Sequence, residues 1–171
     1  MRVLALLLLL LFVNPAAAGE WSVGPAPGDA PDARTAWVED GSGHLLILRN
    51  LRVNGDHWYV VELKLAGGAM FGDDLPTTQI DGGKILENDW QLDHEQYGRT
   101  WGKIDGGTAS WTLLVTTRNI TYAGDVLDDW VKGKSISIGY TTSDGAASVA
   151  RFGLTGMKDA LLALTDIKIE D

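Results

Sequence analysis

The side chains of this chain best suited to bind a ligand are its aromatic rings. The 171 residues include seven tryptophans, a large number for one small domain. Trp90 and Trp101 flank a polar, acidic segment typical of a loop, Tyr97 lies within it, and Trp58 lies on the polar face of a predicted strand. Exposed tryptophan and tyrosine rings stack on sugars or anchor a protein partner. We therefore predict a binding site at Trp58, Trp90, Tyr97 and Trp101, with packing beneath loops as the alternative.

The histidines and carboxylates do not show the spacing of a metal site. His44, His57 and His94 are far apart in the sequence, and none stands in a zinc-binding motif. Acidic stretches such as 87–93 offer oxygen ligands for calcium, but the chain has no D-x-D-x-D-G loop. Acidic loops are also expected on any chain with a net charge of −9. We predict neither a metal site nor a cofactor.

No pattern typical of hydrolytic catalysis is present in the sequence. The chain has no cysteine to act as a thiol nucleophile and no G-x-S-x-G elbow around a serine. The glycine pairs 82–83 and 106–107 do not open helices, which indicates turns and not phosphate-binding loops. Paired carboxylates of the kind that glycoside hydrolases use occur in any acidic chain. These observations favour a non-catalytic protein.

The first eighteen residues have the organisation of a secretory signal peptide. Arg2 supplies a positive charge, residues 3–13 form an unbroken apolar run, and residues 14–15 are a helix-breaking Asn-Pro pair. Ala16-Ala17-Ala18 provide the small residues that a signal peptidase recognises. The apolar run is shorter than the roughly 20 residues of a membrane-spanning helix. We predict cleavage near Ala18 and a protein that is exported, either periplasmic or secreted.

Charge limits the partners of the mature chain. The full chain has a net charge of −9, the predicted removal of Arg2 makes it more negative, and there is no basic run, so the surface repels nucleic acid and anionic lipid. No later segment has the length and hydropathy of a membrane span. The remaining partner classes are an envelope protein or a glycan.

Turn signals and alternating hydropathy predict a mainly β domain over residues 35–171. Asp-Gly or Asn-Gly pairs, which tolerate the positive φ angles of tight hairpins, stand at 40–41, 54–55, 81–82, 105–106 and 144–145. Strands are predicted at Thr35–Glu39, His44–Asn50, His57–Leu65, Thr78–Ile80, Lys84–Leu86, Thr100–Ile104, Ser110–Thr116, Ser135–Thr141 and Ala147–Leu154. Residues 19–34, rich in Pro, Gly, Ala and Asp, are predicted to be an extended N-terminal linker. We expect a single antiparallel β-sandwich or flattened barrel.

Two segments change to a helical period. Residues 124–132 place their apolar side chains on one face, with Asp125 as a candidate N-cap and Gly133 as the stop. Near the C-terminus, Thr155 is a candidate cap for a helix whose apolar face holds Met157, Ala160, Leu161 and Leu164. Helices this short are marginal in water, so both must pack on the sheet.

A series of short motifs runs along the chain in a characteristic order. It comprises an early Trp21, the Trp58–Leu65 strand, Ile80-Asp81-Gly82, the Asp125–Val131 helix, Gly133-Lys134-Ser135-Ile136-Ser137-Ile138, and Phe152-Gly153-Leu154-Thr155-Gly156-Met157 leading to Ala160-Leu161-Leu162. This order resembles the invasion-associated locus B family of exported bacterial proteins, best over residues 121–165. Family members commonly carry cysteines, which this chain lacks. The resemblance implies a periplasmic or envelope β-rich domain, linked by the family name to host-cell entry, with no catalytic residues. We expect it to act through protein contacts, with small-ligand or glycan binding by loop aromatics as the alternative.

We predict that the exported protein begins at Gly19 or within one or two residues of it, because the three preceding alanines are the small residues that a signal peptidase needs. Mass spectrometry of protein recovered from the exported fraction measures this N-terminus directly. A chain that still carries Met1 in that fraction would contradict the predicted location.

Overall fold

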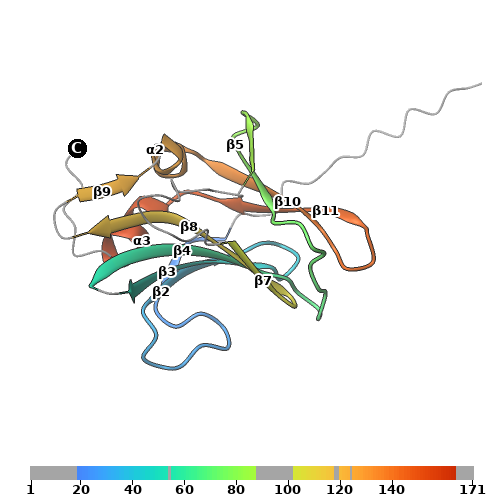
Figure 1. Cartoon of the computed structure of the whole chain (residues 1–171), viewed down its shortest axis with the longest axis horizontal. Coiled ribbons are helices and arrows are strands. Elements are labelled where there is room, and N and C mark those ends of the chain that lie inside the picture. Colours follow the sequence, from blue (N-terminus) through green and yellow to red (C-terminus); the bar gives the residue numbers. More distant parts are fainter. Residues whose placement is uncertain (1–18, 54, 88–101, 118–119, 124, 165–171) are drawn as a thin grey trace, which may run out of the picture.

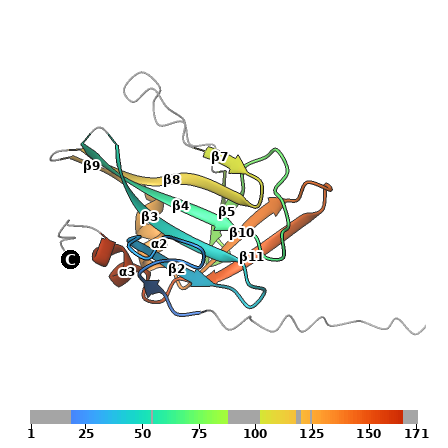
Figure 2. The ribbon, with the colours of Figure 1, turned by 90° about the horizontal axis from the view of Figure 1, so that it is seen from below.

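The computed structural model describes residues 19–164, apart from 54, 88–101, 118–119 and 124 (Figure 1). The described residues form two antiparallel sheets with two short helices packed beside the smaller sheet (Figures 1 and 2). The predicted mainly β fold with two short helices is therefore confirmed, as a sandwich and not as a closed barrel. Elements carry the labels of Figure 1.

The larger sheet has seven strands in the described part of the chain. Their order is β1-β2-β3-β4-β8-β7, and β9 also pairs with β8. The strands are β1 (Ser22–Val23), β2 (Thr35–Glu39), β3 (Leu45–Val53), β4 (Asp56–Lys64), β7 (Gly102–Asp105), β8 (Thr108–Thr117) and β9 (Ile120–Ala123). Strands β2, β3 and β4 follow one another in the sequence, whereas β4 takes the distant β8 as its other neighbour. Alternate side chains of β4, namely Tyr59, Val61 and Leu63, are buried in the core.

The smaller sheet has the order β11-β10-β5-β6. Its strands are β5 (Thr77–Ile80), β6 (Ile85–Glu87), β10 (Ser135–Thr141) and β11 (Ala147–Gly153). The alternation in β10 predicted a half-buried strand, and Ile136, Ile138 and Tyr140 are indeed buried. The β10–β11 hairpin is confirmed, with an unbroken register from Ser135↔Gly153 to Thr141↔Ala147. Strands β1 and β9 had not been predicted, because segments of two and four residues carry too little alternation.

The two helices close one end of the space between the sheets. They are α2 (Asp125–Lys132) and α3 (Met157–Leu164), close to the predicted segments. The predicted apolar face of α3 is buried, at Met157, Ala160, Leu161 and Leu164. These side chains belong to the same apolar cluster as the inward side chains of both sheets. Trp111 of β8 and Trp130 of α2 are buried in that cluster as well.

The segment 19–34, predicted to be an extended linker, lies against the larger sheet. It contains β1, which pairs with β2, and Ala26, which is buried with Leu45 and Ile47 in a small second cluster. Asp29 accepts hydrogen bonds from Arg49 at 2.7 and 2.9 Å, and these bonds hold the pKa of Asp29 below its ordinary range. The segment is thus attached to the sheet by backbone pairing, burial and an ion pair, while the domain boundary at residue 34 stays a prediction.

Among the described residues, no helix has both the length and the apolar character needed to cross a membrane. The predicted leader, residues 1–18, lies outside the described residues, so export and cleavage stay predictions.

The docking of α3 can be tested with two adjacent leucines. Leu161 is fully buried and Leu162 is half-buried, so the same truncation creates a cavity at the first and little at the second. We expect Leu161→Ala to lower the free energy of unfolding by about 2–5 kcal/mol, as leucine truncations in a core do, and Leu162→Ala by less than half of that loss. Urea unfolding of both variants gives the comparison. Equal losses would show that α3 does not dock through the predicted face.

Candidate functional site

Of the four aromatic residues predicted to bind a ligand, Trp58 can be placed. Trp90, Tyr97 and Trp101 lie outside the described residues. Trp58 lies in β4 on the face opposite Tyr59 and Val61, as predicted, but only 7% of it is exposed. The surface position that the alternation indicated for this ring is therefore wrong, because residues 58–61 in the middle of β4 are buried on both faces of the strand. The binding role of the four residues stays a prediction.

The histidines that the structure describes take part in the hydrogen bonding of the fold. Nδ1 of His44 accepts the backbone N–H of Ala66 at 2.9 Å, and the ring lies edge-on to Tyr140. Nδ1 of His57 lies 3.1 Å from Oδ1 of Asn50, whose amide nitrogen donates to the carbonyl of Leu164. No group of three or more histidine, aspartate and glutamate side chains within the described ranges is placed to hold a metal ion.

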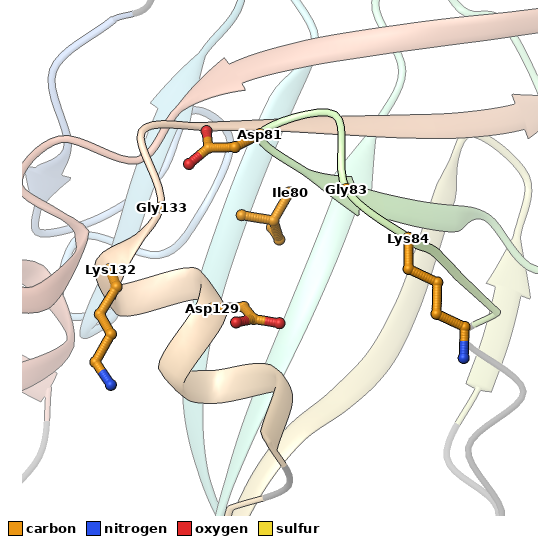
Figure 3. A pocket seen from close by; sticks show the side chains of 7 residues that line it. All are labelled: Ile80, Asp81, Gly83, Lys84, Asp129, Lys132 and Gly133. Atoms are coloured by element: carbon orange, nitrogen blue, oxygen red, sulfur yellow. The ribbon is translucent and has the colours of Figure 1, made fainter.

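A pocket of about 380 Å³ lies where the β5–β6 turn meets the C-terminal end of α2 (Figure 3). We call it the charged pocket. Its lining consists of Ile80, Asp81, Gly83, Lys84, Asp129, Lys132 and Gly133. The described residues of this lining contain two carboxylates and two ammonium groups around an isoleucine, and none of these residues has a hydroxyl, thiol or imidazole that could act as a nucleophile. Such a set is suited to bind polar groups of both signs.

Asp81 fixes the backbone on one side of the charged pocket. Asp81 and Gly82 have φ angles of 46° and 72°, and the N–H of Gly83 donates to the carbonyl of Ile80 at 2.8 Å. Positive φ at both central residues is the geometry of a type I′ hairpin turn, which Asp-Gly tolerates. The turn directs the Asp81 carboxylate away from β5 and toward the start of β10.

The Asp81 carboxylate joins the turn to the strand that follows α2. It accepts the backbone N–H of Lys134 at 3.0 Å, the backbone N–H of Ser135 at 2.8 Å and the hydroxyl of Ser135 at 3.0 Å. These bonds, foremost the one from the Lys134 N–H, favour the charged carboxylate and hold the pKa of Asp81 below its usual range. Two motifs that are far apart in the sequence, 80–82 and 133–138, therefore meet at this carboxylate.

Gly133 lets α2 approach the turn. A Cβ atom at this position would lie 2.6 Å from Cγ2 of Ile80 and 2.7 Å from the carbonyl oxygen of Asp129, which leaves no room for any side chain. The sequence predicted Gly133 as a helix stop, and the structure adds that its main requirement is space. The result is a half-buried Ile80 that forms the apolar floor of the charged pocket and packs against the main core.

The charged side chains that line the pocket are exposed to solvent. Asp129 faces the space between α2 and the turn, while Lys84 and Lys132 extend on opposite sides of the opening (Figure 3). The sequence identified 81–82 as a turn and 133–138 as a motif, yet it gave no sign that they touch. The two segments meet because β5 pairs with β10, which brings Ile80 opposite Ile136. Local sequence patterns do not indicate such a long-range pairing.

No protein-family model matches this chain, and no curated protein matches its sequence. The fold is similar to that in the crystal structure of invasion associated protein b from Bartonella henselae, with a TM-score of 0.50 and 14% sequence identity. The similarity covers 86% of this chain and 92% of that chain. It shows a related β fold for the two proteins.

We predict that Asp81→Asn destabilises the protein at pH 7, because the amide cannot accept the same bonds from Lys134 and Ser135 without bringing its own NH₂ group close to their donors. The pKa of Asp81 is lowered by folding, so its stabilising effect is present above the unfolded-state pKa and is lost as the pH falls through the lower folded-state pKa. The difference between wild type and variant should therefore shrink below about pH 4.

Urea unfolding at neutral and acidic pH measures this difference. Asp73→Asn, at an exposed position, is the matched control and should leave stability nearly unchanged. An equal loss in the two variants at pH 7, or a loss at Asp81 that is independent of pH, would contradict the role given to this carboxylate.

Proposed function

We propose that this protein is an exported, non-catalytic domain that binds another protein at the cell envelope through the charged pocket. The observation that carries the proposal is the pocket itself. The exposed charges of Lys84, Asp129 and Lys132 surround a half-buried isoleucine, and the hydrogen bonds of Asp81 fix the backbone beneath them. A polar rim around an apolar floor is the usual composition of a protein-binding surface.

The presence of both signs in one small pocket favours a protein as the partner. A small anion or cation is held by charges of one sign, whereas a protein surface presents carboxylates, ammonium groups and apolar side chains together. Charges at the rim of an interface mainly set specificity and the rate of association. Because Lys84, Asp129 and Lys132 are exposed, their contribution should weaken as the ionic strength rises.

Two further observations support an envelope protein. Residues 1–18 have the pattern of a signal peptide, which directs the chain out of the cytoplasm. The fold is similar to that of a protein named invasion associated protein b, and the motif order resembles the invasion-associated locus B family. We propose that the present chain shares with that family its envelope location and its action through protein contacts.

Site-directed photo-crosslinking in the exporting cell tests the proposal. A benzophenone amino acid is placed at Asp129, in the charged pocket, and in a second strain at Asp105, an exposed residue on the other sheet. We expect a defined protein adduct from position 129 and none from position 105. Adducts of the same kind from both positions would indicate non-specific contact and contradict the proposal.

Charge reversal in the captured complex gives a quantitative test. Asp129→Lys should slow association with the crosslinked partner, and the effect should decline at high salt, while Asp105→Lys should have little effect. The alternative, a glycan site at Trp58, Trp90, Tyr97 and Trp101, predicts instead a saturable change of tryptophan emission on titration with cell-wall glycans. A saturable emission change with glycans, together with unaltered partner binding by Asp129→Lys, would contradict the proposed function and support the glycan site.

A further inference from the structure

Strand β11 is the outer strand of the smaller sheet, at the opposite side of that sheet from the charged pocket. It pairs with β10 on one side, and no described strand pairs with its other side. We call the backbone groups of residues 147–151 that point away from β10 the β11 edge. Both views show the turn of the β10–β11 hairpin at the end of the molecule that lies away from α2 and α3 (Figures 1 and 2).

The hydrogen-bond phase of the hairpin identifies the outward groups. The N–H of Thr142 donates to the carbonyl of Ala146, and the N–H of Leu154 donates to the carbonyl of Lys134, both at 2.9 Å. In an antiparallel pair, hydrogen-bonded and non-hydrogen-bonded residue pairs alternate. Counting from these two bonds, the backbone groups of Ala147, Val149 and Arg151 point outward.

A contact from outside the sheet agrees with this assignment. The next residue in the same phase is Gly153, and its carbonyl accepts the indole N–H of Trp21 at 3.0 Å. The side chain of Trp21 therefore occupies the last outward position of β11. Within the described part of the chain, no strand pairs with the backbone groups of the three outward residues before it, Ala147, Val149 and Arg151.

The β11 edge lacks most of the features that protect sheet edges. Proteins protect edges with short strands, charged side chains, prolines or bulges. The other outer strands, β1, β6, β7 and β9, have two, three, four and four residues, whereas β11 has seven residues in an unbroken register. Val149, the central residue with outward backbone groups, has an apolar side chain that is 49% exposed, and the exposed Arg151 is the one charged side chain among the three outward residues. Seven regular residues with an exposed valine form a template for strand addition.

A pocket lies at the C-terminal end of the β11 edge. We call it the Trp21 pocket; it has a volume of about 300 Å³ and is lined by Glu20, Trp21, Val23, Thr155, Gly156, Asp159 and Ala160. The bond from Trp21 to Gly153 places this pocket in line with the edge. Val23 is 55% exposed and offers apolar surface, while the exposed Glu20 and Asp159 make the rim acidic.

We propose that the β11 edge and the Trp21 pocket together form a binding site for an extended, basic segment of another protein. The segment adds to β11 as an antiparallel strand and pairs with the outward N–H and C=O groups of Ala147, Val149 and Arg151. An apolar side chain of the segment enters the Trp21 pocket, and an adjacent lysine or arginine lies near Glu20 and Asp159. Main-chain pairing supplies affinity in such a mode, and the pocket supplies specificity.

Charge favours this occupant over a second copy of the chain. In a two-fold pairing of β11 centred on Val149, the β10–β11 turn of one copy would reach the Trp21 pocket of the other. That turn carries Asp144, which would then approach the acidic rim at Glu20 and Asp159. The net charge of −9 adds repulsion between two copies, whereas it attracts a basic segment.

Backbone methylation of a synthetic peptide tests the pairing without altering the protein. The probe is acetyl-TKVTVTLKT-amide, and binding is measured by calorimetry and by NMR shifts of the amides of Ala147, Val149 and Arg151. Two further probes carry N-methyl groups on alternate amides, one on the odd-numbered and the other on the even-numbered positions of the peptide. The probe whose methylated amides face β11 has lost its donors and should bind at least about tenfold more weakly than the parent peptide. The other probe should bind like the parent peptide.

Variants of the protein separate the edge from the pocket. Val149→Pro removes an outward N–H while it leaves every β10–β11 bond in place, and it should weaken binding about tenfold. Val149→Thr keeps the N–H and is the matched control, with circular dichroism to check that both variants are folded. Val23→Lys should weaken binding of the basic peptide, and Asp129→Lys, in the charged pocket, should not.

Several results would overturn this site. The proposal is wrong if both methylated probes bind like the parent peptide, or if a peptide with glutamate in place of lysine binds equally well. It is also wrong if the parent peptide does not bind at millimolar concentration. A dimer in which the amides of Ala147, Val149 and Arg151 are protected would show that a second copy occupies the edge. Since Asp129→Lys reports on the charged pocket alone, failure here is distinguishable from failure of the proposed function.

Discussion

Burial of one apolar cluster between the two sheets has to stabilise this fold without covalent cross-links, because the chain has no cysteine. Small exported domains often rely on disulfides, so here the packing has to be complete. The larger sheet contributes one wall of the cluster, and the second wall combines the smaller sheet with α2 and α3. The helices therefore cover the part of the larger sheet that the smaller sheet does not reach. This arrangement explains why α3 buries an entire face although it has only eight residues.

The Asp81 carboxylate links that packing to the charged pocket. Strand β5 pairs with β10, and the hydrogen bonds of Asp81 to Lys134 and Ser135 extend this pairing into the turn. The same bonds set the point at which the chain leaves α2 and enters β10. The exposed charges of Asp129 and Lys132 are thus presented by a backbone that the core and one carboxylate hold in place. A surface presented in this way loses little conformational entropy on binding, which favours recognition by contact.

Local sequence patterns predicted most elements well, because the hydropathy period of a strand or helix is contained in its own residues. The alternation of β10 and the i, i+3, i+4, i+7 spacing of α3 agree with the observed strand and helix. The long-range pairings of β4 with β8 and of β5 with β10 have no such signal, and the charged pocket depends on the second of them. Trp58 shows the same limit in another form. Its neighbours in the sequence indicated a polar face, but its burial is decided by residues that pack on it in three dimensions.

The two proposed sites lie on opposite sides of the smaller sheet, and the sheet itself accounts for their difference. At β5–β6 the hydrogen bonding ends in a tight turn whose carboxylate is already committed to β10, so recognition there has to rely on exposed side chains. At β11 the strand is long and regular, so recognition there uses the backbone, with side-chain specificity confined to the Trp21 pocket. Side-chain recognition is sensitive to salt, whereas backbone pairing is sensitive to the conformation of the partner. A domain with both sites would therefore hold two different kinds of partner surface at once, one folded and charged, the other extended, without any rearrangement of its core.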